Sequence, residues 1–165
     1  MSLQEELGFK RPFQNQGHEV LLNIVLTGSL LNKEGTKFFR PFGITEAQFN
    51  VLMLLQYQSD QGRINQTSLG KMMLVNRSNV TGLVDRMEKA GLVRRIDDPE
   101  DRRVNMVEMT AQGAKVLETA GKAYYARIEQ LMRGMTAEEY RLLSKMLERI
   151  RALLNGRGKQ GGESA

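Results

Sequence analysis

The chain of 165 residues is long enough for one ordinary domain, or for a compact domain with an added association element. It contains no cysteine and one histidine, His18, which excludes disulfides, thiolate or histidine-rich metal sites and redox sensing through a thiol. The net charge of +5 is concentrated in residues 63–95, where seven Lys/Arg accompany two acids, and this favours a polyanionic partner.

Two helices are predicted in the first third of the chain. Apolar residues recur at helical spacing over residues 14–38, and Pro41 and Gly43 end this helix. Thr45 and Gln48 form a capping box, which predicts the start of a second helix through the apolar residues that follow.

Two short helices separated by a break are predicted next. The first extends from about Thr67 to Met73, and the second from about Arg77 to Ala90. Asn76 lies in the break and is a good N-cap for the second helix. Gly91 directly follows this helix, at the position where a left-handed C-cap is expected.

A charged β-hairpin follows these helices. Residues 92–96 and 104–109 are rich in β-formers and flank a polar turn, so they are expected to pair as two short strands.

Two long helices and a polar tail complete the chain. Thr110 and Thr136 are caps for helices predicted over about 111–133 and up to about residue 155. The apolar stripe of the last helix is wider than a single surface helix needs, which predicts burial in a dimer interface. Residues 156–165 are polar and glycine-rich and are expected to be disordered.

This order of elements predicts a mainly α fold with a small β-hairpin wing. Helix, break, helix and hairpin is the outline of a winged helix-turn-helix lobe, expected over about 45–110. The terminal helices, 14–38 and 111–155, are expected to build a helical dimerisation lobe, so that residues 1–155 form a single domain.

The helix predicted over residues 77–90 has two different faces when residues are placed at about 100° intervals. One face is an apolar stripe that is expected to face the core: Val80, Leu83, Val84 and Met87. The other is small and polar at its N-terminal half, where three side chains suit base edges in a major groove: Ser78, Asn79 and Thr81. Gly82 lies at the centre of this face. Either it permits a close approach of DNA, or the helix tolerates it at a cost of about 1 kcal/mol.

Arg102 and Arg103 stand in the hairpin loop behind four acids, the last of which is Asp101. One interpretation is that an acid pairs with an arginine and holds it extended, so that the arginine enters the narrow, negative minor groove. The alternative is a solvated charged turn.

Three segments together resemble the MarR family of bacterial transcription regulators. They are the run from Leu69 to Arg95, which contains the pattern V-D-R-x-E-x-x-G-L-V-x-R, the wing D-P-E-D-R-R of residues 98–103, and the helix start T-A-Q-G of residues 110–113. The order of the helices agrees with the family along nearly the whole chain. Gly82 departs from the basic residue that many relatives carry in the middle of the recognition helix.

The resemblance implies a homodimer that binds a near-palindromic operator in double-stranded DNA. Its two recognition helices would enter successive major grooves, and each wing would reach the flanking minor groove. The resemblance also implies a repressor that a small aromatic or anionic ligand releases from DNA, although it assigns no ligand-binding residue.

By position, the resemblance assigns base contacts to Ser78, Asn79 and Thr81. Arg77, Arg86 and the amides near Ser68 would touch phosphates. Arg102 and Arg103 are both candidates for the minor groove, with Asp101 as the partner. The complete set of implied DNA-binding residues is Ser68, Asn76, Arg77, Ser78, Asn79, Thr81, Gly82, Arg86, Asp101, Arg102 and Arg103.

Other classes of function fit the sequence less well. An enzyme is not expected, because there is no cysteine nucleophile, no Gly-x-Ser-x-Gly elbow and no phosphate loop. The alternatives are a winged-helix module for protein contacts and an activator without a small-molecule ligand. Methionines such as Met53, Met72 and Met73 either line an adaptable ligand cleft or pack in the core. No apolar run approaches the ~18 residues that cross a bilayer, so a cytoplasmic protein is expected. No metal or cofactor is expected either.

Overall fold

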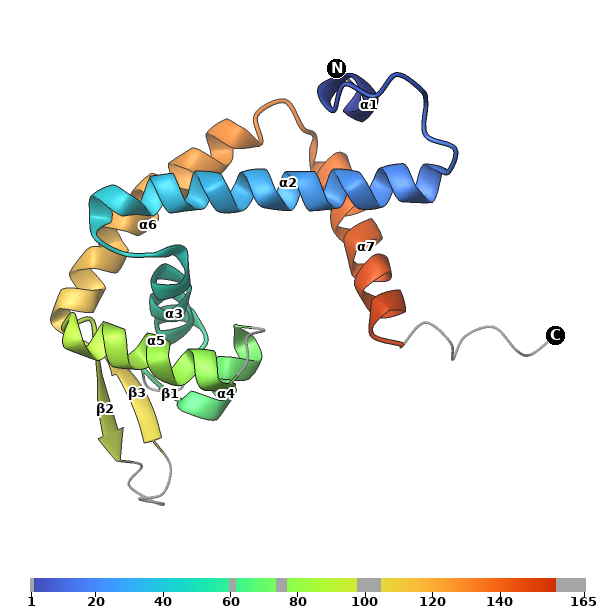
Figure 1. The fold of residues 1–165 in the computed structure, drawn as a ribbon. Coiled ribbons are helices and arrows are strands. Elements are labelled where there is room, and N and C mark those ends of the chain that lie inside the picture. Colours follow the sequence, from blue (N-terminus) through green and yellow to red (C-terminus); the bar gives the residue numbers. More distant parts are fainter. Residues whose placement is uncertain (1, 60–61, 74–76, 98–104, 157–165) are drawn as a thin grey trace. The chain divides into compact units, whose positions relative to one another are not determined.

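The structure is a computed structural model that describes residues 2–59, 62–73, 77–97 and 105–156. Helices and strands follow one another along the chain as drawn in Figure 1. In chain order they are α1 (Leu3–Glu6), α2 (Gln16–Phe39), the 3-10 helix η1 (Arg40–Phe42), α3 (Glu46–Tyr57), β1 (Arg63–Asn65), α4 (Gln66–Met72), α5 (Arg77–Lys89), β2 (Val93–Asp97), β3 (Asn105–Met109), α6 (Ala111–Leu131) and α7 (Ala137–Leu154).

The first long helix, α2, ends where an aromatic side chain packs against α3. Phe39 is 1% exposed, and the centroid of its ring lies 4.6 Å from that of Phe49. Gly43 leaves η1 with a φ of 68°, a left-handed conformation that glycine adopts without strain. The hydroxyl of Thr45 then accepts from the Gln48 amide, and the Gln48 side chain accepts from the Thr45 amide. The predicted capping box at the start of α3 is therefore confirmed.

Three short strands form one antiparallel sheet in the order β1-β3-β2. β2 and β3 are the predicted hairpin, and Val93 pairs with Met109 at its base. β1 has no counterpart among the predicted elements. It is three residues long, and its one apolar residue, Ile64, pairs with the buried Val107. Such a short strand lacks the alternation by which a sequence reveals a β-strand.

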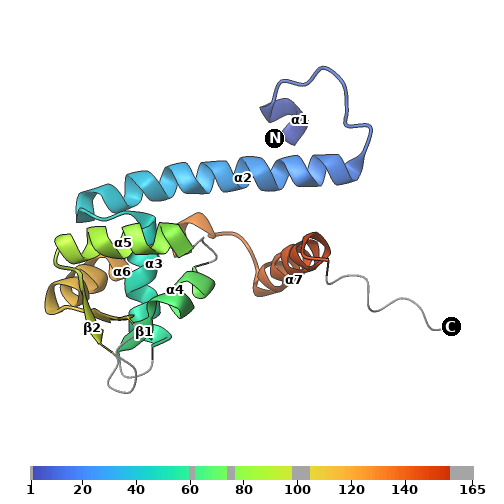
Figure 2. The same ribbon diagram turned by 60° about the horizontal axis from the view of Figure 1, so that its bottom comes forward.

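The core of this part of the chain lies among α3, α4, α5 and the sheet, which Figure 2 shows close together. Apolar side chains from each of these elements are buried there: Phe49, Leu52, Leu55, Ile64, Leu69, Val80, Val84, Met87, Val93 and Val107. Burying each such side chain stabilises the fold by roughly 1.5–3 kcal/mol relative to leaving it exposed. The helix-turn-helix of α4 and α5, followed by the β2–β3 hairpin, is the predicted winged helix-turn-helix.

The chain divides into a unit up to Lys122 and a second unit from Ala123 onward. The second unit contains the end of α6 and all of α7. Within it, Thr136 and Glu139 form the predicted capping box, and the Tyr140 hydroxyl donates to the Met132 carbonyl at 2.8 Å. The single domain over residues 1–155 and its division into two lobes stay predictions.

Two further short elements, α1 and η1, have no predicted counterpart because neither spans two helical turns, so no apolar spacing can repeat within them. Among the described residues, no helix combines the length and the apolar character that crossing a membrane requires. Residues 157–165, nearly all of the tail that is expected to be disordered, lie outside the described residues.

Candidate nucleic-acid interface

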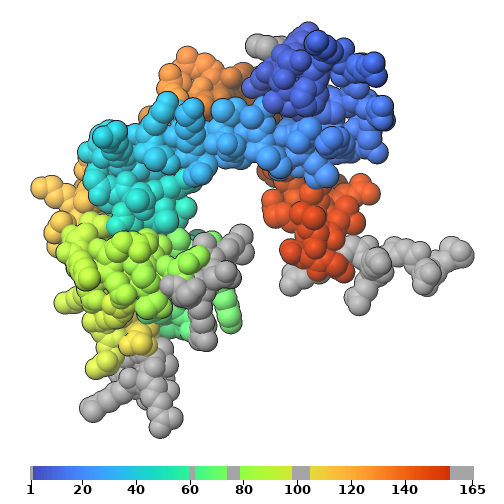
Figure 3. Space-filling view, in the orientation of Figure 1, coloured from blue at the N-terminus to red at the C-terminus, as the bar shows by residue number. Residues whose placement is uncertain are grey.

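The helix predicted to read DNA is α5, and its two faces are separated as the sequence predicts. The apolar stripe is 0–6% exposed: Val80, Leu83, Val84 and Met87. The other side carries exposed polar and basic residues: Asn79, Thr81, Arg86 and Lys89. α5 contributes much of the surface that this part of the chain shows in Figure 3. The helix is anchored by one face and leaves the other open to a partner.

Gly82 lies on this open face, where the structure leaves space for a side chain. An ideal Cβ at this position would lie 3.4 Å from Nη1 of Arg86, which is an ordinary van der Waals distance. Packing inside the described part of the chain therefore does not explain why the residue is glycine.

A hydrogen bond joins Thr81 to the preceding helix. Nε2 of Gln66, the first residue of α4, donates to Oγ1 of Thr81 at 2.7 Å. The two helices of the motif are thereby tied together at the exposed face of α5. The sequence does not single out Gln66, because the two residues are 15 positions apart and no periodicity connects them.

The start of α4 is capped by the side chain of Asn65. Its Oδ1 accepts from the Ser68 amide at 2.7 Å, which satisfies one of the N–H groups that a helix leaves unpaired. The predicted phosphate contact of the Ser68 amide stays a prediction, and a phosphate would compete there with the cap.

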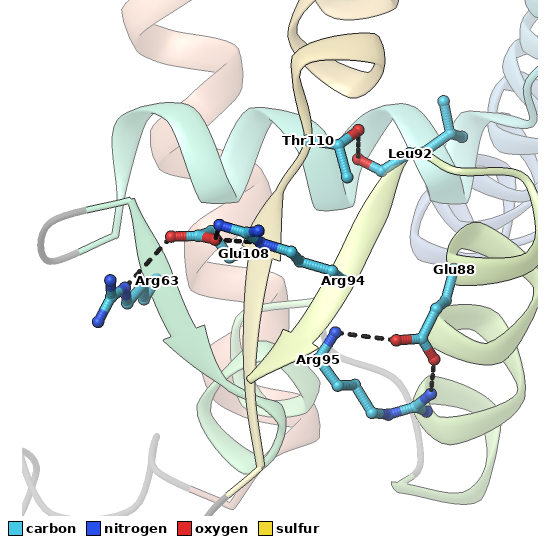
Figure 4. A network of polar contacts seen from close by, with 7 residues as sticks. All are labelled: Arg63, Glu88, Leu92, Arg94, Arg95, Glu108 and Thr110. Atoms are coloured by element: carbon cyan, nitrogen blue, oxygen red, sulfur yellow. Dashed lines mark hydrogen bonds and ion pairs between the residues drawn. The ribbon is translucent and has the colours of Figure 1, made fainter. Parts of the chain in front are cut away.

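Arg95 of β2 clamps the hairpin to α5 (Figure 4). Its guanidinium pairs with Asp85 and Glu88 on the helix, with Nη1 2.5 Å from Oε2 of Glu88. The Arg95 amide also donates to Oε1 of Glu88 at 2.9 Å, and this bond, helped by the guanidinium, lowers the pKa of Glu88. These contacts give a structural reason for the Asp, the Glu and the final Arg of the V-D-R-x-E-x-x-G-L-V-x-R pattern.

A second cluster of charges joins all three strands (Figure 4). Glu108 of β3 lies between Arg63 of β1 and Arg94 of β2. It accepts from Nε of Arg63 at 3.3 Å and from Nε of Arg94 at 2.5 Å. The hydrogen bond from Arg94 is the main reason why the pKa of Glu108 is lowered, and Arg63 adds to it.

These ion pairs engage some of the basic residues that give residues 63–95 their excess of positive charge. Arg63, Arg94 and Arg95 are all engaged with carboxylates of the sheet and of α5. Lys71 of α4 and Arg86 and Lys89 of α5 remain on the exposed surface. Within the described part of residues 63–95, the exposed cations outside these pairs therefore lie on the helices of the motif.

The T-x-x-G start of α6 holds the base of the hairpin. Oγ1 of Thr110 donates to the Gly91 carbonyl at 2.6 Å and accepts from the Gly113 amide at 3.0 Å. The same hydroxyl lies 3.1 Å from the Leu92 carbonyl (Figure 4). Gly113 approaches Leu92 so closely that a Cβ would lie 2.1 Å from the Leu92 carbonyl oxygen. Gly91 has a φ of 69°, as expected for the predicted C-cap of α5.

Several predicted contact residues are not placed by the structure. Four of them lie outside the described residues: Asn76, Asp101, Arg102 and Arg103. Arg77 and Ser78 form the first turn of α5, but their side chains are outside the description. The minor-groove contact of Arg102 or Arg103 therefore stays a prediction. In the described part of the chain, no three acidic or histidine side chains gather in a way that would hold a metal ion.

The sequence of the chain is similar to those of a family of transcription regulators. Residues 44–104 match the MarR family. The chain is 33% identical to the uncharacterized HTH-type transcriptional regulator YdgJ of Bacillus subtilis over 121 residues, an alignment that covers 73% of this chain and 72% of that protein. It is 30% identical to the HTH-type transcriptional repressor YetL of the same species over 129 residues, an alignment that covers 78% of this chain and 77% of that protein.

Solved structures show the same fold. Sco3205, a MarR family transcriptional regulator from Streptomyces coelicolor in complex with DNA, matches with a TM-score of 0.79 and 24% identity over 94% of this chain and 95% of that chain. The organohalide sensing regulator RdhR-CbdbA1625 in its 2,4-dichlorophenol bound form matches with a TM-score of 0.75 and 21% identity over 88% of this chain and 87% of that chain.

The α4–α5 pair, the hairpin clamped to it and the exposed polar face of α5 define a winged helix-turn-helix protein. The chain belongs to the MarR family of transcription regulators. It is a regulator of transcription and not an enzyme.

Proposed function

We propose that the chain is a homodimeric regulator that binds a near-palindromic operator in the bacterial cytoplasm. This proposal rests on the two faces of α5, one of which is buried and the other exposed. Val80 and Val84 are fully buried, while Asn79 and Thr81 face solvent beside the basic Arg86. A helix needs such an exposed polar face to exchange hydrogen bonds with base edges in a major groove. The structure of Sco3205 in complex with DNA supports this use of the fold.

Exposed apolar side chains on two helices support the homodimer. On α2 they are Val20, Leu21, Val25, Leu30 and Leu31, and on α7 they are Leu142, Leu143, Met146, Leu153 and Leu154. Exposed apolar surfaces of this kind mark association sites, and homodimers with two-fold symmetry are the commonest assembly. We place the dimerisation lobe on these helices, with one α5 for each half-site.

Selection of bound sequences from random duplex DNA, followed by gel shift, tests the proposal. The wild-type protein should enrich a pseudo-palindrome, and its affinity should fall steeply as salt rises because Lys and Arg release counterions from phosphates. Asn79→Ala and Arg86→Ala should weaken operator binding, while Gln56→Ala on the exposed side of α3 should leave it unchanged. A protein that enriches no sequence would instead be a module for protein contacts.

The wing contact is tested separately, because the residues concerned lie outside the described part of the chain. We place either Arg102 or Arg103 in the minor groove, with Asp101 holding it. One of the single variants Arg102→Ala and Arg103→Ala should weaken operator binding without lowering the melting temperature. Unchanged affinity in both single variants and in the double variant would contradict this assignment.

A groove between α3 and α4 supports the proposal that the protein is a repressor, which a small aromatic ligand releases from DNA. It encloses about 340 Å³ and is lined by Asn50, Met53, Leu54, Tyr57, Gln58, Met72 and Met73. Methionine side chains adapt to flat rings, and the two amides offer hydrogen bonds. None of these lining residues is basic, so the groove suits a neutral phenol better than a carboxylate. RdhR-CbdbA1625 bound to 2,4-dichlorophenol and the repressor YetL support this mode of regulation.

The ligand proposal is tested with 2,4-dichlorophenol, using benzoate as the anionic comparison. The phenol should raise the melting temperature and weaken operator binding, and benzoate should do so less. Met53→Ala should reduce both effects of the phenol. If neither compound changes the melting temperature or DNA affinity, the groove is not the effector site, and an activator without a ligand becomes the better proposal.

A further inference from the structure

We propose that Gln66 is a specificity-determining residue, which reads an adenine of the operator while Thr81 holds it in place. This inference rests on the proposed DNA-binding function and goes beyond it, because Gln66 belongs to the first helix of the motif. The second helix is the one expected to read bases, whereas the first is expected to cross the backbone.

The position of Gln66 is fixed by its contact with α5. Nε2 of Gln66 donates to Oγ1 of Thr81 at 2.7 Å, and Thr81 is exposed on the polar face of α5. Gln66 itself is half-buried at the first position of α4, directly after the Asn65 cap. The bond therefore places the end of the Gln66 side chain at the surface that α5 presents, next to a residue that is expected to touch bases.

The groups that remain on the Gln66 amide match one base. A glutamine side chain has two N–H donors and one carbonyl acceptor, and Thr81 takes one donor. The second N–H and the carbonyl are the pair that binds N7 and N6 of adenine in a bidentate contact. Guanine presents two acceptors at the same edge, so its O6 would face the glutamine carbonyl without a hydrogen atom between them.

The neighbourhood of Thr81 favours such a contact. Gly82 follows it directly and has no side chain to stand between the base edge and the glutamine. A glutamine already held by Thr81 also loses less conformational freedom on binding than a solvated one would. The hydrogen bond thus gives the first helix a part in base recognition.

The experiment compares the base preferences of full-length variants. Sequences are selected from random duplex DNA with the wild-type protein, with Gln66→Ala, with Gln66→Glu and with the control Gln56→Ala on α3. Their affinities are then measured on operators in which each base pair is changed in turn. Melting temperatures check that every variant is folded.

Wild-type protein should prefer A·T at one position of each half-site, and Gln66→Ala should lose about tenfold of that discrimination at that position alone. Gln66→Glu should shift the preference there toward cytosine, whose amino group donates to a carboxylate. Thr81→Val, which removes the acceptor, should weaken the same preference, and Thr81→Ser should keep it. Gln56→Ala should behave as wild type.

Other results overturn the inference. If Gln66→Ala weakens binding equally on every operator, Gln66 is a phosphate contact or a support of the fold. If its base preferences equal those of the wild type, Gln66 has no part in recognition. In both cases the proposed function stands, whereas a wild-type protein that enriches no sequence overturns the function and this inference together.

Discussion

Gly82 occupies a helical position at which alanine is the more stable residue. A Cβ would meet Arg86 only at van der Waals distance, so Gly82→Ala should stabilise the protein by about 0.8–1.0 kcal/mol, measured as a higher melting temperature. If the glycine serves close approach of DNA, the same variant should bind the operator about tenfold more weakly, because a steric clash costs roughly 1–3 kcal/mol. Higher stability with unchanged affinity would show that the helix only tolerates the glycine.

Gly113 is the opposite case, because the fold itself leaves no space for a side chain. A Cβ there would lie 2.1 Å from the Leu92 carbonyl oxygen and 3.0 Å from Cγ of Met109. Gly113→Ala should therefore lower the free energy of unfolding by about 1–3 kcal/mol or more, since backbone must move. The matched control is Gly121→Ala in the same helix, where no described atom beyond the neighbouring residues and the local helix backbone lies within 4 Å of the added Cβ. Equal unfolding curves for the two variants would contradict this account of the T-x-x-G motif.

Glu108 pairs with an arginine on each neighbouring strand, so its charge is expected to stabilise the three-stranded sheet. Because Arg94 and Arg63 lower its pKa in the folded protein, the carboxylate contributes stability above the ordinary glutamate pKa of about 4.3. That contribution is lost as the pH falls through the lowered folded-state value. Melting temperatures measured from pH 7 to pH 3 should therefore fall less steeply for Glu108→Gln than for the wild type, and Glu148→Gln on α7 should behave as wild type. Parallel curves for Glu108→Gln and the wild type would argue against the cluster.

The elements differ in how well the sequence predicts them, and the difference has a physical basis. α2, α3, α5 and the β2–β3 hairpin are recognisable because each has a periodic apolar face or a local capping signal, as at Thr45. β1 and the bond between Gln66 and Thr81 join residues that are distant in sequence. Only the folded chain brings them together, and no local pattern marks them.

The same distinction holds for the basic residues. A count of charges along residues 63–95 cannot separate Arg86, which is exposed, from Arg95, which is 26% exposed and clamps the hairpin to α5. Both the spacing of Asp85 and Glu88 on α5 and the position of Arg95 after Gly91 are visible in the sequence. Their convergence depends on the turn at Gly91, whose left-handed conformation lets β2 follow α5 closely enough for Arg95 to reach Glu88.

At the scale of the whole molecule, DNA affinity should depend on association through residues far from α5. Val25 of α2 is 67% exposed in the single chain, so Val25→Glu should not disturb the fold of the unit to which it belongs. Burying an unpaired carboxylate between two copies is costly, however, and the variant should fall apart into chains of 18.7 kDa, measured by light scattering.

The loss of the dimer should also weaken operator binding, because one chain engages only one half-site and the contribution of the second α5 is lost. Gel shift should therefore find Val25→Glu weaker than wild type by about a hundredfold or more, the scale on which linked sites gain affinity. Gln56→Glu introduces the same charge on α3 and should change neither the mass of the dimer in light scattering nor its affinity for the operator. A dimeric Val25→Glu would move the interface elsewhere, whereas a monomeric variant with full operator affinity would mean that a single α5 is sufficient for recognition.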